Sequence, residues 1–467
     1  MIDNMGQWYG IELLCIGNKG VRIWDSLKKF PGCSVETLAK MYGIEGKKDK
    51  PDFSKYIPEN YQPTDDEISY CVQDSKIVAY AIYQQLLQGY EAITLSADAF
   101  NCVKELLGGH YRWRNVMPQL PIEMDDFARN AYKGGWVYVN PKYQGKEVNN
   151  VYVYDVNSLY PWVMHDCELP LGPGYLHRPY GNQLSILRFE TIFKLETGFP
   201  TIQIKHNMRY KGTEYLKKVD EPVTLTMTNI DYKLFTENYN VEYMSEPEYL
   251  SFNSKVGLLA PYIDKWMKVK EEASYIPNVQ HENKPVRFMS KRYLNSPYGK
   301  TGMKPTRINK IPRKDDDQCL RYDIDVTTIE GIYVPYATFV CAWARDKTVR
   351  AAQSESDAFV YADTDSVHLV NTELADELVD PVKLGYWKHE GTFQIGKYVR
   401  PKTYIHATKE NTEYKITDVT CAGMPNAVKE HVTWNNFIPG NEFKGKLQQQ
   451  QVPGGCLLVE TTFRISE

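Results

Sequence analysis

The sequence predicts an α+β protein that contains more than one domain. The chain has 467 residues, more than a single hydrophobic core usually serves, so roughly two to four domains or subdomains are expected. Alternating apolar residues at 151–155 and 359–370 are typical of strands, whereas the apolar residues of 67–87 recur at helical spacing. Hydrophobic residues make up 42% of the chain and charged residues 24%, which is typical of an ordinary globular protein.

Charge, cysteine content and hydropathy exclude several classes of protein. Aspartate and glutamate (59) outnumber lysine and arginine (55), which argues against a wholly basic nucleic-acid coat but not against a local basic groove. Nine cysteines without any C-x-x-C pair argue against a zinc knuckle or a disulfide framework and favour a reducing cytosol. We expect no signal peptide and no membrane partner, because neither a leader pattern nor a run of about eighteen apolar residues occurs.

The N-terminal half predicts the following order of elements. Residues 1–45 alternate short apolar runs with turns, residues 45–66 form a polar loop, and a helix covers 67–87. A second loop precedes a domain boundary near residue 120. A strand that ends at Asp155 then passes directly into a short helix.

The C-terminal half predicts strands and helices in mixed order. Residues 166–262 predict several strands, 263–300 predict basic helices, and 303–330 predict an exposed hairpin. A long helix at 332–353 leads into a hairpin at 359–370, and the tail predicts two short strands around a turn.

Three aspartates stand where an apolar strand ends. Asp363 and Asp365 are one residue apart in FVYADTDSVHLV, and residues i and i+2 of a strand share a face. Asp155 closes another strand. Carboxylates that converge without a cation repel, whereas a pair of Mg²⁺ or Mn²⁺ ions removes that cost and can clamp the oxygens of a phosphoryl transfer. Taken alone, the D-T-D sequence is equally typical of a solvated turn with side-chain caps.

Two further motifs contain cations and tyrosines. Arg287, Lys291, Asn295 and Tyr298 follow one another at spacings of 4, 4 and 3 residues, which places them within about 80° on one helix face. Such a stripe suits a triphosphate and a base, although a solvated basic face has the same pattern. Lys402 and Tyr404, with Lys397 just upstream, are expected to share a strand face that contacts a nucleic-acid backbone; the alternative is an ordinary surface strand.

In this order the motifs resemble those of family B DNA polymerases. The stretches DVNSLYP (155–161), KRYLNSPYG (291–299), YADTDS (361–366) and KTY (402–404) are similar to motifs A, B, C and the K-x-Y element of that family. YKGG (132–135) is similar to the Y-x-G-G element that joins exonuclease and polymerase. Further stretches along essentially the whole chain are similar to the protein-primed, phi-29-like phage branch.

The resemblance implies a right-hand fold with palm, fingers and thumb, next to a partial ribonuclease-H-like exonuclease domain. The domains that it implies are a partial 3′–5′ exonuclease domain at 1–120, palm at 121–165, an insertion contacting the priming protein at 166–262, fingers at 263–302, a processivity and strand-displacement insertion at 303–330, the second part of the palm at 331–436 and the thumb at 437–467.

The resemblance also implies roles for individual residues. Asp155, Asp363 and Asp365 would be catalytic; Asp155 and Asp365 would be the main metal ligands, assisted by the Val156 carbonyl. The implied nucleotide-binding residues are Lys270, Arg287 and Lys291 for the triphosphate, Asn295 and Tyr298 for the nascent base pair, and Tyr160 for the sugar, where it would exclude a 2′-hydroxyl. The implied DNA-binding residues are Ser158, Tyr132, Gly134, Gly135, Lys402 and Tyr404.

The implied activity is template-directed DNA synthesis on a linear genome, primed by a protein and displacing the other strand. It would use two Mg²⁺ ions, for which Mn²⁺ can substitute, with primer–template DNA and deoxynucleotides as substrates. A terminal priming protein would be the partner, so that we expect a monomer or a heterodimer with it, in a bacterial host cytoplasm. The alternatives are an RNA-making palm enzyme, which Tyr160 argues against, and a truncated DNA-binding protein without full activity, which the three aspartates argue against.

The sequence departs from the family in two places. Of the exonuclease motifs only Tyr70 and Asp74 are found, with Lys48 at the position of the exonuclease lysine, because Asp65-x-Glu67 lies too close to Tyr70. We therefore expect a chain that begins after the first two motifs and does not proofread on its own. The second departure is Pro297, where the family usually has an aliphatic residue. We expect a kink or a helix end there, helped by Gly299, since proline strains the carbonyl of Tyr293.

Overall fold

The computed structural model describes residues 10–14, 20–45, 60–204, 214–274, 284–317, 319–328, 332–452 and 455–466. The chain divides into two compact units. The first is drawn from residues 1–113, 259–300 and 308–310, and the second from 114–258, 301–307 and 311–467. Within the described ranges, no helix has both the length and the apolar character needed to cross a bilayer.

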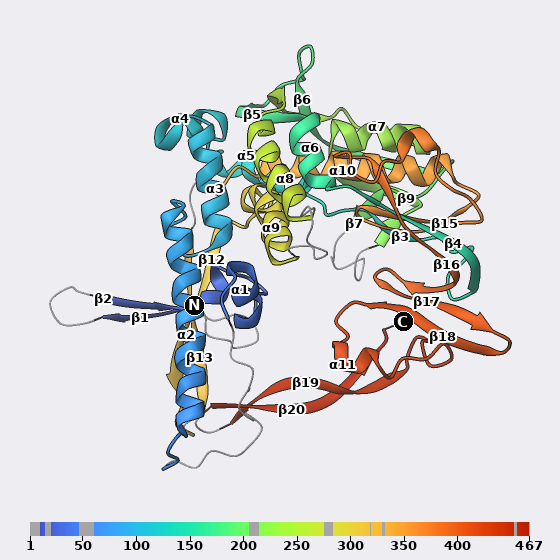
Figure 1. Ribbon diagram of the computed structural model, residues 1–467. Helices are drawn as coiled ribbons and strands as arrows, with labels where there is room; N and C mark the ends of the chain where they lie inside the picture. The colour runs from blue at the N-terminus through green and yellow to red at the C-terminus, as the bar shows by residue number, and fades with distance from the viewer. Residues whose placement is uncertain are drawn as a thin grey trace. The chain divides into compact units, whose positions relative to one another are not determined.

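The first unit is mainly helical (Figure 1). Its elements are β1 (Gly10–Leu14), β2 (Gly20–Trp24), η1 (Ser26–Lys28), α1 (Val35–Tyr42), α2 (Asp65–Leu87), α3 (Leu95–Leu106), α8 (Ala260–Ser274) and α9 (Lys284–Thr301), and α4 (Gly109–Val116) spans its boundary with the second unit. Helix α2 begins with a capping box, in which the Thr64 hydroxyl accepts from the Glu67 amide at 3.3 Å and the Glu67 carboxylate accepts from the Thr64 amide at 2.8 Å. The letters Asp65-x-Glu67 thus belong to a helix start.

Helix α9 does not end at Pro297. It continues to Thr301 with the proline inside it, and Gly299 does not adopt the left-handed conformation of a helix cap, so the expectation of a helix end was wrong. In an uninterrupted helix the carbonyl of Tyr293 would accept from the amide of residue 297, which proline lacks. Here that carbonyl accepts from the hydroxyl of Tyr262 in α8, at 2.8 Å. Because a side chain from another helix replaces the missing donor, the backbone can remain helical.

The second unit contains a seven-stranded antiparallel sheet with the strand order β18-β17-β16-β4-β15-β14-β3. The strands are β3 (Val137–Val139), β4 (Glu147–Val156), β14 (Phe359–Asp363), β15 (Ser366–Val370), β16 (Trp387–Arg400), β17 (Thr403–Glu410) and β18 (Glu413–Cys421). Helix α10 (Val334–Ser354), with Pro335 in its first turn, packs on β14 and β15 and also contacts α5 (Ile122–Ala131) and α6 (Leu159–Asp166). Most of its side chains are buried, as expected for a helix that is apolar on nearly every side.

A second, five-stranded sheet is built from the segment between α6 and α8. Its strands are β5 (Glu168–Tyr175), β6 (Leu184–Leu195), β9 (Lys218–Thr228), β10 (Tyr239–Met244) and β11 (Glu248–Val256), in the order β10-β6-β11-β5 with β9 also paired to β6. The same segment contains a separate two-stranded sheet, β7 (Ile202–Ile204) and β8 (Glu214–Leu216), and helix α7 (Asn229–Asn238). Phe193, Phe235 and Tyr239 lie in its own buried core.

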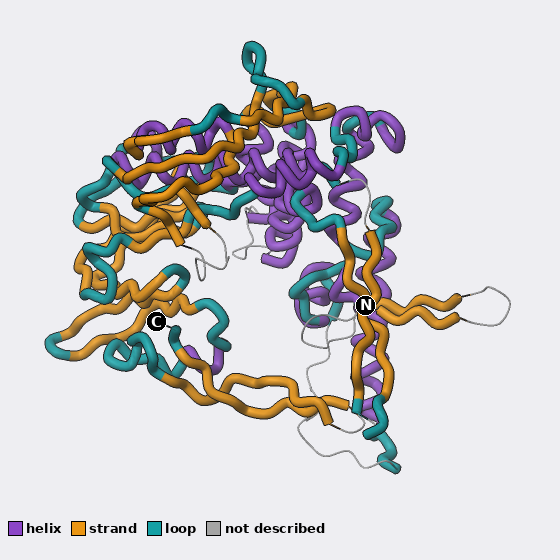
Figure 2. Tube along the Cα trace, turned by 180° about the vertical axis from the view of Figure 1, so that it is seen from behind, coloured by secondary structure: helices purple, strands orange, loops and turns teal. Residues whose placement is uncertain are grey.

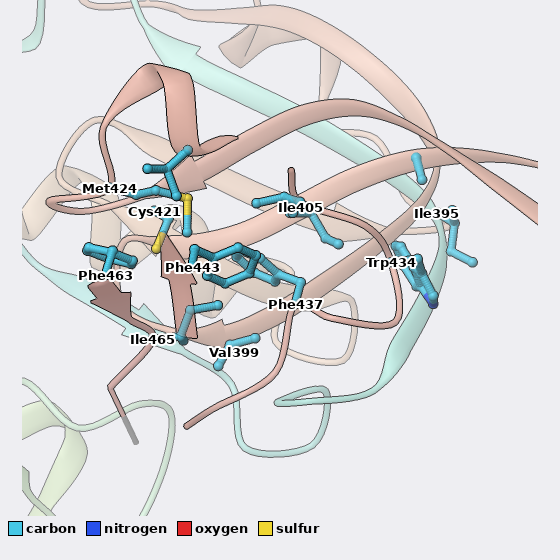
Figure 3. Close-up of a cluster of buried hydrophobic side chains, with 13 residues drawn as sticks. Ile395, Val399, Ile405, Cys421, Met424, Trp434, Phe437, Phe443, Phe463 and Ile465 are labelled. Carbon is cyan, nitrogen blue, oxygen red and sulfur yellow. The ribbon is translucent and has the colours of Figure 1, made fainter. Parts of the chain in front are cut away.

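The C-terminal part has a separate buried core. Side chains from β16, β17 and β18 meet others from α11 (Asn426–Lys429), β19 (Glu442–Val452), β20 (Gly455–Arg464) and the loops between them. Figure 3 shows Phe437 and Phe443 at its centre, with Val399 and Ile465 beside them. Strands β19 and β20 are 11 and 10 residues long, so the prediction of short strands was wrong, and Figure 2 shows the pair as an extended ribbon.

The hairpin predicted at 303–330 is formed by β12 (Thr306–Lys314) and β13 (Leu320–Thr328). Most of its described side chains are exposed. A short 3-10 helix, η2 (Asp376–Leu378), lies in the connection between β15 and β16.

Candidate active site

The three aspartates of the sequence analysis lie at one end of the seven-stranded sheet. Asp155 of β4 is paired opposite Ser366 of β15, and Ser366 is also paired opposite Asp363 of β14. The amide of Val156 donates to the carbonyl of Asp365 at 2.7 Å. Because directly opposed Cα atoms lie about 4.5–5.5 Å apart, Asp155 and Asp365 are less than about 10 Å apart between Cα atoms. All three aspartates are half-buried.

Asp363 and Asp365 do not belong to one strand. Asp363 ends β14, while Thr364 and Asp365 form the turn, with Thr364 at φ 61°. The rule that residues i and i+2 share a face therefore does not apply to this pair, and that step of the prediction was wrong. Directly paired residues do share a face, which places Asp155, Asp363 and Ser366 on the same side of the sheet.

The turn is strained and is held from two sides. A positive φ is rare for a β-branched residue, and such strain persists only where the surroundings fix it. The Thr364 amide donates to the Trp136 carbonyl at 2.8 Å, and its carbonyl accepts from the Thr348 hydroxyl of α10 at 2.6 Å. A Cβ on Gly135 would lie 2.5 Å from the Thr364 hydroxyl oxygen, so this position of the YKGG stretch requires glycine. The YKGG stretch and the turn at Thr364 are thus directly packed together.

Lys402 is the counterion of Asp363. Its Nζ lies 2.6 Å from Oδ1 and 2.8 Å from Oδ2, while its amide donates to the Tyr361 hydroxyl at 3.0 Å. Lys402 has φ 58° and lies in the turn before β17, so it does not share a strand face with Tyr404 as the sequence suggested. Lys397 is engaged as well, since its ammonium donates to the Trp434 carbonyl.

The acidic end of the sheet fits a divalent cation without forming a closed metal cage. Among the residues that the structure describes, no group of three or more His, Cys, Asp or Glu side chains could hold a metal ion. Lys402 engages the carboxylate of Asp363 at this end of the sheet. Asp155 and Asp365 supply the other two carboxylates at this end of the sheet. Such a pair suits Mg²⁺, which usually takes one or two carboxylates together with water and substrate phosphates.

Motif A continues from β4 into α6 over a sharp turn. Ser158 precedes the helix at φ 54°, and Tyr160 lies in its first turn, half-buried. The amide of Asn157 donates to the Tyr386 carbonyl at 2.9 Å. A Cβ on Gly385 would lie 2.1 Å from the Trp162 ring, so the neighbouring loop also needs a glycine to approach this helix.

A buried arginine that belongs to none of the predicted motifs fixes the YKGG stretch. Arg345 of α10 is 5% exposed; its Nε and Nη2 donate to Asp231 at 2.9 and 2.7 Å. Its Nη1 donates to the carbonyls of Lys133 and Gly134 at 2.7 and 2.8 Å. Burial opposes the charge, but Asp231 outweighs it and raises the pKa of Arg345. The signal in the sequence was an arginine directly after the apolar run that begins α10.

The remaining predicted nucleotide-binding residues lie in the first unit. On α9, Arg287 and Lys291 are exposed and Asn295 and Tyr298 are half-buried, while the opposite side of the helix is buried. Lys270 lies in the C-terminal half of α8 and is half-buried. The predicted exonuclease pair is Tyr70 and Asp74, one turn apart on α2, where burial and then Asp74 raise the pKa of Tyr70; Lys48 lies outside the described residues.

Comparison with known proteins decides which family this architecture belongs to. The family model for DNA polymerase type B, organellar and viral, matches residues 1–383. The chain belongs to this family. It is 38% identical to the DNA polymerase of Bacillus phage Nf and 37% identical to that of Bacillus phage phi29, each match covering 100% of this chain and 84% of the relative. The DNA polymerase of Streptococcus phage Cp-1 is 31% identical, over 100% of this chain and 83% of that protein.

Solved structures agree with this assignment. Phi29 DNA polymerase complexed with primer-template DNA and incoming nucleotide matches with a TM-score of 0.89 at 36% identity, covering 100% of this chain and 84% of that one. The same polymerase complexed with single-stranded DNA matches with a TM-score of 0.86. The predicted α+β family B polymerase fold and the resemblance to phi29-like phage polymerases are confirmed, and the chain is a DNA-directed DNA polymerase.

A buried chain of polar rings supports this polymerase's acidic turn. The hydroxyl of Tyr398 lies 2.7 Å from Nδ1 of His368 and 2.9 Å from Nε2 of His406. Tyr361 packs against His368 and Tyr398, and its hydroxyl donates to Asp363 at 3.3 Å. Both histidines are almost fully buried, at 1% and 2% exposure. Burial lowers the pKa of His406 from 6.5 to about 4 and also lowers that of His368 well below its ordinary value.

These histidines predict an acid-sensitive fold. The pKa of His406 is lower in the folded state than in the unfolded state, so between the two pKa values the unfolded state binds more protons. The free energy of unfolding should therefore be at its full value above about pH 6.5 and should fall as the pH drops toward 4. His406 alone should contribute a loss of about 3 kcal/mol. Urea unfolding at a series of pH values measures this, and His406→Gln should make the dependence shallower. Equal slopes for the variant and the wild type would contradict the prediction.

Proposed function

We propose that this polymerase copies a linear template by protein-primed, strand-displacing synthesis with two divalent cations at Asp155 and Asp365. The observation that best supports this is the pairing of β4 with β15, which brings motifs A and C together at one end of the sheet. The phi29 polymerase is described in complex with primer-template DNA and incoming nucleotide. We infer the same substrates here: primer–template DNA and deoxynucleotides.

The residues would divide the work as follows. The carboxylates of Asp155 and Asp365, with the Val156 carbonyl, would hold the cations, which supply Lewis acidity and neutralise charge on the phosphates. Lys402 compensates the charge of Asp363, so that this acid does not repel the other two. Arg287 and Lys291, both exposed, would attract the triphosphate, and catalysis would rest mainly on positioning and charge neutralisation.

We assign the remaining segments by the same reasoning. Lys270 would join the triphosphate site, and Asn295 and Tyr298 would contact the nascent base pair. Tyr160 would exclude nucleotides that carry a 2′-hydroxyl. Tyr132, Gly134, Gly135, Ser158 and Tyr404 would contact DNA. The sheet-forming insertion at 166–262 would contact the priming protein, the hairpin at 303–330 would encircle DNA, and 437–467 would form the thumb. The relatives are phage proteins, so the polymerase would work in a bacterial cytoplasm. It would act there as a monomer or as a heterodimer with the priming protein.

Primer extension on a primed single-stranded circle tests this function. We expect Mg²⁺-dependent products longer than one copy of the circle, because strand displacement lets the polymerase continue past the 5′ end of the primer. Deoxynucleotides should be preferred over ribonucleotides by about a hundredfold or more, and Tyr160→Val should narrow that preference. Failure of the wild type to extend would favour the DNA-binding alternative. Equal use of both nucleotides would favour an RNA-making enzyme.

A further inference from the structure

The carbonyl of Tyr293 in α9 has an unusual hydrogen-bond donor. Residue 297 is a proline, so the helix offers this carbonyl no amide at the i+4 position. The hydroxyl of Tyr262 donates to it at 2.8 Å instead. Tyr262 and Tyr293 are 4% and 2% exposed, and Pro297 is buried, so water has little access to this part of the helix. An unpaired carbonyl at such a position would be costly.

The surroundings hold both tyrosines in place. The ring of Tyr293 stacks on Trp266 of α8, with centroids 3.9 Å apart and planes 9° apart, and its hydroxyl donates to Gln85 at 3.3 Å. Tyr293 is thus fixed from two sides. Burial raises the pKa of Tyr262 far above its ordinary value, so its hydroxyl keeps the proton that it donates.

We propose that Tyr262 and Pro297 form a matched pair, in which the tyrosine hydroxyl replaces the amide that proline lacks and thereby fixes the turn bearing Asn295 and Tyr298. Tyr262 is then a positioning residue for nucleotide binding. This role rests on the proposed function, because it assumes that Asn295 and Tyr298 meet the nascent base pair. Without the hydroxyl, the buried carbonyl turns outward in search of a donor, and a helix with such a break bends there. The half-buried Tyr298, next to the proline, would move first.

Four enzymes test the pair by steady-state primer extension: wild type, Tyr262→Phe, Pro297→Leu and the double variant. Tyr262→Phe should raise KM for the incoming deoxynucleotide about tenfold and leave kcat within about twofold, an effect typical of one lost hydrogen bond to a buried group. Pro297→Leu restores an amide for Tyr293 and should change KM little. In that background Tyr262→Phe should have almost no effect, since the carbonyl no longer needs the hydroxyl.

Tyr333→Phe provides a matched control. Tyr333 is also buried and its hydroxyl also donates to a backbone carbonyl, that of Gly172 at 2.9 Å, but it belongs to the second unit. Its effect on KM, whatever its size, should be the same with Pro297 and with Leu at 297. Pro297→Leu should thus restore KM in the Tyr262→Phe enzyme but not in the Tyr333→Phe enzyme. A general packing role of buried tyrosines would not predict this difference.

Two results would overturn the proposal. One is a Tyr262→Phe defect that persists in full in the double variant, because the hydroxyl would then act elsewhere than on the Tyr293 carbonyl. The other is a loss in kcat with KM unchanged, because positioning of the nucleotide would then not be involved. Urea unfolding of the same four proteins measures the coupling without catalysis. If the wild type extends no primer, the proposed function fails. The unfolding free energies of the four proteins still test whether Tyr262 and Pro297 form a pair.

Discussion

Replacing Asp365 with asparagine is expected to lower the rate of primer extension by about three orders of magnitude or more. The substitution keeps the shape of the side chain but removes one of the two carboxylates that would hold the cations. Charge stabilisation by a bound metal contributes several kcal/mol to such reactions, and each 1.36 kcal/mol corresponds to about tenfold in rate. Asp155→Asn should have an effect of similar size, because both acids lie at the junction of β4 and β15. Single-turnover extension with saturating DNA and nucleotide measures the loss.

Asp220→Asn is the control for this prediction. Asp220 of β9 is an exposed carboxylate paired with Lys218, outside the acidic end of the seven-stranded sheet. Its removal should leave extension within about twofold. Primer–template affinity of Asp365→Asn should also stay close to that of the wild type, since phosphate contacts dominate DNA affinity. An Asp365→Asn enzyme that extends at more than a tenth of the normal rate would show that this carboxylate is not a principal ligand.

Arg345→Met is expected to have the second largest effect, acting on stability and on DNA binding together. Removing one partner of a buried ion pair costs about 3–5 kcal/mol, because Asp231 is left charged and unpaired. The carbonyls of Lys133 and Gly134 lose their donor at the same time. The free energy of unfolding should therefore fall by about 3–5 kcal/mol, and affinity for primer–template should fall because the YKGG stretch is no longer fixed. Urea unfolding and DNA titration measure the two effects.

A double variant separates these effects. Arg345→Met with Asp231→Leu replaces the whole buried pair by apolar groups and should recover most of the stability, but not the DNA affinity. Arg350→Met is the matched control on the same helix: Arg350 is 41% exposed and pairs with Asp346 and Glu237, so its loss should cost less than about 1 kcal/mol. If DNA affinity returned together with stability, the contacts of Arg345 with the YKGG stretch would have no role in DNA binding.

Local patterns were enough to predict many elements of this fold. Helix α2 was predicted from its apolar spacing and α10 from its long apolar run, and the strand-to-helix passage at Asp155 appears as β4 followed by α6. The exposed basic side of α9 agrees with the spacing of Arg287 and Lys291. These features depend on residues close together in the sequence, and periodicity reports such relations directly.

Contacts between distant segments could not be predicted in this way. Lys402 pairs with Asp363, 39 residues away, and Arg345 pairs with Asp231, 114 residues away. Of the kink or helix end expected at Pro297, the helix end did not occur, and the hydroxyl that replaces the missing amide comes from Tyr262 in a different helix. The hairpin at 359–370 was predicted, but a shared strand face for Asp363 and Asp365 was wrong. The left-handed conformation of Thr364, which Trp136 and Thr348 hold from elsewhere in the chain, places Asp365 in the turn.

Locating bound Mn²⁺ in a crystal of the polymerase with primer–template DNA and a non-hydrolysable deoxynucleotide tests the central claim most directly. We predict anomalous peaks within about 2.0–2.4 Å of carboxylate oxygens of both Asp155 and Asp365, with the nucleotide phosphates completing the coordination. Lys402 should still contact Asp363. Manganese bound at other side chains, with the carboxylates of Asp155 and Asp365 too far apart to share an ion, would contradict the account.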